Sequence, residues 1–140
     1  MLKYYAGIGS RETSNEILEY FSKLGTFFTK KGYTLRSGHA QGADKAFEIG
    51  NDKANGLKEI YLPWKNFEGS NSNLFTTNPK AIVIAKQFHP YWAKLSDGAR
   101  SLQSRNSHQV LGLDLETPSE FIICWTKGGQ LPATLKGSGL

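Results

Sequence analysis

The sequence predicts an α/β fold with a mainly parallel sheet. Short apolar segments alternate with segments of helical periodicity, and two of the apolar segments end in glycine-rich turns. The order over residues 3–62 is strand, helix, strand, helix, strand, which implies parallel strands joined by right-handed crossovers. We therefore expect residues 1–140 to form a single Rossmann-like, doubly wound domain with helices on both faces of the sheet.

The first strand is predicted at residues 3–8, and an apolar stripe over residues 17–28 follows it. This stripe repeats at the 3.6-residue period of a helix. Thr13 and Glu16 have the spacing of a capping box, which would begin that helix. Gly32 follows two lysines, and this combination predicts the end of the helix.

The second strand is predicted at residues 33–37, where apolar and β-branched residues precede a glycine-rich turn. A helix carrying Ala46, Phe47 and Ile49 follows the turn. Residues 58–62 predict the third strand. A repeated strand, turn and helix is typical of proteins with a parallel sheet.

The remaining elements begin with a long connection over residues 63–79. This connection is polar and rich in asparagine, serine and glycine, which is typical of a surface loop. Helices are predicted at residues 79–86 and 97–111, and His89-Pro90 interrupts the chain between them. Residues 120–125 predict the last strand.

Composition indicates an anionic partner and a reduced setting. The net charge of +5 and the pI of 9.3 suit a nucleotide or a nucleic acid. The single cysteine, Cys124, lies in an apolar run and has no partner for an internal disulfide, which favours the cytoplasm. The chain has no signal-peptide pattern and no apolar run of the roughly 20 residues that a membrane helix needs. We expect a soluble protein with no membrane contact.

A phosphate-binding turn is predicted where the first strand ends, at Gly7-Ile8-Gly9-Ser10-Arg11. Glycine lets the backbone approach an anion closely, and the following helix N-terminus presents free amides. The arginine adds a guanidinium suited to bidentate phosphate recognition. Tight strand-to-helix bends also use glycine, so this turn alone leaves a purely structural role open.

A second turn of this kind follows the second strand. Its residues are Ser37, Gly38, His39, Gln41, Gly42, Ala43 and Asp44. Ligands of doubly wound sheets bind at the carboxyl ends of the strands, so the two turns are expected to face one crevice. Asp44 either compensates the dipole of its helix or accepts ribose hydroxyls. His39 is a turn residue, a base or a donor to phosphate.

Further candidate site residues lie late in the chain. Trp125, Thr126 and Lys127 end the last strand and offer a ring for stacking, a hydroxyl and a charge. Arg105 and Asn106 lie in the middle of a predicted helix, where a solvated polar face is the ordinary explanation. Metal-ligand spacings and known catalytic motifs are missing from the sequence. We therefore expect a binding site with no metal, no cofactor and no defined catalytic residue.

Three segments together resemble the SLOG superfamily: residues 5–13 (YAGIGSRET), 35–44 (LRSGHAQGAD) and 121–126 (FIICWT). This superfamily includes the Rossmann-like core of the DNA-processing protein A family, the LOG phosphoribohydrolases and sensor domains for nucleotide signals. The chain is most similar to small phage-type proteins described as DNA-processing protein A-like. The resemblance implies that both turns line a nucleotide pocket and that Arg105 and Asn106 face it.

The sequence departs from the family pattern near its end. Relatives continue past the last strand with a glycine-rich turn, a helix and a strand, whereas here Gly137-Ser138-Gly139 resembles only the start of that turn. The glutamate that LOG enzymes carry after the turn is also missing, so the resemblance implies binding more than hydrolysis. Without the last helix, apolar sheet surface would be exposed, and a second copy of the chain would cover it. We therefore expect a homo-oligomer.

Three functions follow from the sequence, in order of preference. The first is binding of a nucleotide-derived small molecule, with sequestration of a defence signal for a phage as one role. The second is a single-stranded DNA-binding mediator of recombination, which the net charge supports although Lys30-Lys31 is the only adjacent basic pair. The third is hydrolysis of nucleoside monophosphates to free base.

Overall fold

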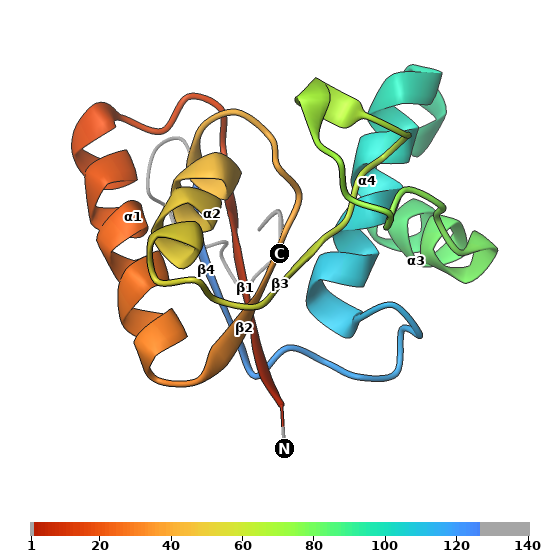
Figure 1. The fold of residues 1–140 in the computed structure, drawn as a ribbon. Coiled ribbons are helices and arrows are strands. Elements are labelled where there is room, and N and C mark those ends of the chain that lie inside the picture. Colours follow the sequence, from red (N-terminus) through yellow and green to blue (C-terminus); the bar gives the residue numbers. More distant parts are fainter. Residues whose placement is uncertain (1, 127–140) are drawn as a thin grey trace.

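Over residues 2–126, which the computed structural model describes, the chain forms a four-stranded parallel sheet in the order β3-β2-β1-β4 (Figure 1). The strands are β1 (Lys3–Gly9), β2 (Tyr33–Ser37), β3 (Lys58–Ile60) and β4 (Phe121–Trp125). The fold class is therefore α/β with a parallel sheet, as the sequence predicts. The strand order reverses at β1, because β2 and β3 extend to one side and β4 pairs on the other. Such a reversal opens a crevice at the carboxyl ends of the strands.

The helices form two pairs (Figure 1). One pair, α1 (Asn15–Lys30) and α2 (Ala43–Lys53), packs together on one side of the sheet. The second pair, α3 (Pro79–Phe88) and α4 (Asp97–Leu111), lies across the sheet from them, and α4 contacts β1 and β2. Short 3-10 turns, η1 (Phe67–Gly69) and η2 (Trp92–Lys94), lie in the connections. Within residues 2–126 no helix has the length and apolar content to cross a membrane.

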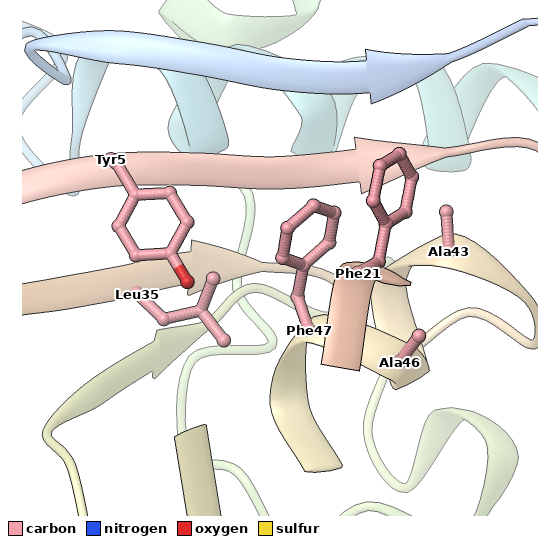
Figure 2. Packing of buried hydrophobic residues seen from close by; sticks show 6 residues of the cluster. All are labelled: Tyr5, Phe21, Leu35, Ala43, Ala46 and Phe47. Atoms are coloured by element: carbon pink, nitrogen blue, oxygen red, sulfur yellow. The ribbon is translucent and has the colours of Figure 1, made fainter. Parts of the chain in front are cut away.

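The main core fills the space between the sheet and the α1–α2 pair. Figure 2 shows its buried side chains, which are Tyr5, Phe21, Leu35, Ala43, Ala46 and Phe47. The rings of Phe21 and Phe47 stack with their centroids 4.4 Å apart. Gly7 lies directly beneath Phe47, because a Cβ at this position would collide with that ring. The first glycine of the first turn is therefore needed for packing.

The start of α1 differs from the prediction. Ser14 is the N-cap, and its hydroxyl accepts a hydrogen bond from the Ile17 amide at 3.4 Å. The predicted capping box of Thr13 and Glu16 is wrong, because the buried Thr13 hydroxyl donates instead to the Ser10 carbonyl at 2.6 Å. Thr13 thereby holds the turn that follows β1.

Other boundaries shift by a few residues. β3 ends at Ile60 and not at residue 62, because Tyr61 pairs with Leu74 and the Leu62 amide donates to the Leu74 carbonyl. The helix predicted over residues 79–86 runs on to Phe88. The first helix ends where predicted, at Lys30, and Gly32 follows with a φ of 90°.

Candidate functional site

A cavity of about 350 Å³ lies at the carboxyl ends of β1 and β4. Its walls are the turn after β1, the end of β4 and one side of α4. The predicted site residues on these walls are Ile8, Gly9, Ser10, Arg11, Asp44, Arg105, Asn106, Trp125 and Thr126. The structure thus brings residues from four separate segments to the crevice that the strand order creates.

The other predicted site residues, apart from Lys127, are not part of the cavity lining. They are Gly7, Ser37, Gly38, His39, Gln41, Gly42 and Ala43. Ser37 is fully buried, and its hydroxyl donates to the Gly7 carbonyl at 2.5 Å. His39 Nδ1 lies 2.6 Å from Glu48 Oε1. Lys127 lies outside the described residues.

The second turn packs against the backbone of the first turn. Gly42 has a φ of 100°, and a Cβ there would lie 2.6 Å from the Ser10 carbonyl oxygen. The Ala43 amide donates to the same oxygen at 3.4 Å. Glycine is therefore required at position 42 because one turn packs on the other, and the second turn contributes Ala40 and Asp44 to the cavity lining.

Asp44 connects the two turns through its carboxylate. Its Oδ1 accepts a hydrogen bond from the Gly9 amide at 3.1 Å, and its Oδ2 lies 4.0 Å from Arg105 Nη2. Burial raises the pKa of Asp44 to about 6, although Arg105 and the backbone amides of Gly9, Ala40 and Gly38 oppose the rise. The protein's own carboxylate therefore takes the Gly9 amide that the sequence assigns to a phosphate.

Arg105 is buried, with 3% of its surface exposed, whereas a solvated position is the ordinary expectation for such a residue. Its Nη1 donates to the carbonyl oxygens of Gly38 at 2.9 Å and Tyr61 at 2.7 Å, and its Nε donates to Asn106 Oδ1 at 2.9 Å. Burial lowers the pKa of Arg105, and the Asp44 carboxylate opposes that effect. Arg105 thus connects α4 to the residues that directly follow β2 and β3, and it contributes positive charge to the cavity.

Five residues of the cavity lining were not predicted as site residues from the sequence: Ala40, Leu102, Gln103, Gln109 and Cys124. Three of them lie on α4 with Arg105 and Asn106, at spacings of three or four residues that place them on one side of a helix. Their spacing from Arg105 was the available signal. The sequence does not show that Arg105 is buried, so this side of the helix could not be distinguished from a solvent-exposed side.

Gln109 is a buried residue of the cavity lining. It is 1% exposed, and among the described residues its Nε2 has no hydrogen-bond partner. A buried amide without a partner costs about 1–3 kcal/mol. Its Nε2 packs against Gly38, because a Cβ on that glycine would collide with it, so the atom is enclosed by the protein.

The end of β4 fixes the first turn and forms the cavity floor. The Ser10 amide donates to the Trp125 carbonyl at 3.2 Å. Cys124 pairs with Ile8 across the parallel strands, and both residues line the cavity. Burial raises the pKa of the Cys124 thiol, which keeps it protonated near neutral pH. Trp125 packs against the main core, so part of its ring is already covered, and stacking on it stays a prediction.

Among the cavity-lining residues that the structure describes, Arg11 is the exposed cation, with 58% of its side chain accessible. Its Nη2 lies 3.4 Å from Glu68 Oε2, which belongs to η1. The site therefore combines two guanidinium groups, one titratable carboxyl and three carboxamides. Within residues 2–126, histidine, cysteine and acidic side chains form no group of three that would hold a metal ion.

Comparison with models of known families, with curated proteins and with solved structures gave no match for this chain.

Proposed function

We propose that the domain binds a nucleotide-derived small molecule in the cavity at the ends of β1 and β4. The observation that carries this proposal is the lining of the cavity, which brings two arginines and the carboxamides of Gln103 and Asn106 to the carboxyl ends of β1 and β4. A volume of about 350 Å³ lies within the range of small-molecule sites, about 300–1,000 Å³. Membership of the SLOG superfamily, close to DNA-processing protein A-like phage proteins, is part of the same proposal.

The side chains of the cavity suit the two halves of such a ligand. The half-buried carboxamides of Gln103 and Asn106 offer donors and acceptors to a base or a ribose. The Arg11 guanidinium is accessible and suits a phosphate. Sequestration of a defence signal is one role that such binding would serve.

Isothermal titration with AMP, ADP-ribose and a cyclic dinucleotide tests the proposal. We expect at least one of these to bind, and Arg11→Ala to weaken binding about tenfold or more, since hydrogen bonds to a charged group contribute about 1.5–3 kcal/mol. Lys23→Ala is the matched control, because it removes the same charge from an exposed position on α1. Absence of binding across all three ligands would contradict the proposal, as would equal losses in the two variants.

A second candidate function, hydrolysis of a nucleoside monophosphate, rests on Asp44. A carboxyl on the cavity wall with a pKa near 6 has the properties of a general acid or base near neutral pH. Release of free adenine from AMP, lost in Asp44→Asn, would support hydrolysis. Unchanged AMP after prolonged incubation would leave binding as the proposal.

Three further expectations stay predictions. Single-stranded DNA binding would appear as a mobility shift of an oligonucleotide at low salt, which rising salt would abolish. Homo-oligomerisation would appear in light scattering as a mass above 15.5 kDa. A cytoplasmic location would be tested by fractionation of cells that express the protein.

A further inference from the structure

The carboxylate of Glu68 is held by donors from both glycine turns. Its Oε2 lies 3.4 Å from Arg11 Nη2 and 3.4 Å from the backbone nitrogen of Gln41. Arg11 belongs to the turn after β1, and Gln41 to the turn after β2. A carboxylate of the protein itself therefore occupies the place where one turn presents a guanidinium and the other a backbone N–H.

A second guanidinium shares this charged region. Burial lowers the pKa of Arg105, the carboxylates of Asp44 and Glu68 raise it, and the Arg11 charge lowers it. Glu68 therefore lies within electrostatic range of both arginines that line the cavity. The region around its carboxylate is suited to an anion with more charge than one carboxylate carries.

The contacts of Glu68 are weak enough to be exchanged. Both distances exceed the 2.7–2.9 Å typical of charge-assisted hydrogen bonds, and the Arg11 side chain is more than half exposed. Exposed ion pairs of this kind contribute little to the free energy of folding. A phosphate carries more charge than a carboxylate and has three acceptor oxygens, so it would satisfy the same donors more fully.

The backbone beside Glu68 is anchored independently of these contacts. Phe67 is buried in a cluster with Ile60 and Leu62, and its ring meets Trp64 edge-on at 5.3 Å. The Arg105 guanidinium lies 5.3 Å from the same ring. Displacement of the carboxylate therefore needs only rotation of the Glu68 side chain and no opening of the loop.

We propose that Arg11 and the Gln41 amide form an anion subsite, which Glu68 fills in the free protein and from which a phosphoryl group of the ligand displaces it. The inference rests on the proposed function, because Arg11 belongs to the subsite and also lines the cavity. It adds the ligand's chemical class: a phosphate monoester or a pyrophosphate. Glu68 lowers the affinity for every such ligand by competing with it.

The test is titration of inorganic pyrophosphate, which has no base or ribose, into wild type and Glu68→Gln. We expect the variant to bind pyrophosphate about two- to fivefold more tightly, the range that loss of one exposed ion pair allows. Glu19→Gln is the matched control, since it removes the same charge from the exposed surface of α1 and should bind like wild type. In an Arg11→Ala background, Glu68→Gln should not change the affinity for pyrophosphate.

The outcomes separate this inference from the proposed function. Equal affinities of wild type and Glu68→Gln for pyrophosphate, or no binding by either, would overturn the subsite even if AMP or ADP-ribose binds. An equal gain in Glu19→Gln would also overturn it, because general electrostatics would then explain the effect. A gain confined to Glu68→Gln with no nucleotide binding would support the subsite and refute the proposed nucleotide ligand.

Discussion

Acidification should increase the contribution of Asp44 to stability, which is the reverse of the usual behaviour of a carboxyl group. Burial raises its pKa from 3.8 to about 6 in the folded protein. Between those two values the folded state therefore binds more protons than the unfolded state. Linkage then requires that stability falls as the pH rises through this window and reaches its lower level above about pH 6.

The size of the effect follows from the shift. A change of about 2 pKa units corresponds to about 3 kcal/mol, since each unit is 1.36 kcal/mol. Asp44 is 3% exposed, so solvent screens little of this. Other carboxyls oppose the trend, because backbone and Thr117 hydrogen bonds lower the pKa of Asp114. The comparison with Asp44→Asn isolates the contribution of Asp44.

Urea unfolding of wild type and Asp44→Asn from about pH 4 to about pH 7 measures this contribution. The wild-type free energy of unfolding should fall by up to about 3 kcal/mol relative to the variant as the pH rises, mostly between about pH 4 and pH 6. Glu19→Gln controls for the loss of an exposed carboxyl. A constant difference between wild type and Asp44→Asn across this range would show that folding does not raise the pKa of Asp44.

Three other predictions concern packing and the site. Gly7→Ala should destabilise the fold by about 1–3 kcal/mol in urea unfolding, because the new methyl group meets the Phe47 ring, and an unchanged midpoint would contradict this. Arg105→Lys should lower the melting temperature in calorimetry, because an ammonium cannot reproduce the bonds to two carbonyl oxygens and to Asn106; wild-type melting would show that these bonds contribute little. Gln109→Leu should leave the melting temperature equal or higher, because it removes an unpartnered buried amide. A large loss of stability in Gln109→Leu would show that the amide is satisfied in the free protein.

The sequence was sufficient to predict the parallel sheet, because alternating apolar strands and periodic helices leave few other topologies. It also placed both glycine turns at the carboxyl edge. It did not distinguish their roles. Gly42 permits the close approach of another turn, and Gly7 permits the close approach of a ring, but both have the same appearance in a sequence as a glycine that faces a ligand.

The cavity wall on α4 was harder to predict, because burial there depends on partners distant in sequence. Arg105 is held by the carbonyl oxygens of Gly38 and Tyr61, which are 67 and 44 residues away along the chain. Gln109 is buried on the same helix, and the residues around it in the sequence do not indicate that burial. Asp44 was singled out from its position at a helix start, but its hydrogen bond to the Gly9 amide joins two turns 35 residues apart.

Above all, we propose that a nucleotide-derived ligand binds in the cavity at the ends of β1 and β4. The side-chain amide resonances of Gln103 and Asn106, which line that cavity, report on such binding when ¹⁵N-labelled protein is titrated with AMP, ADP-ribose and a cyclic dinucleotide. We expect a saturable shift of these resonances with at least one ligand, and its loss in Arg11→Ala. Resonances that stay in place at millimolar concentrations of all three ligands would show that the cavity binds none of them.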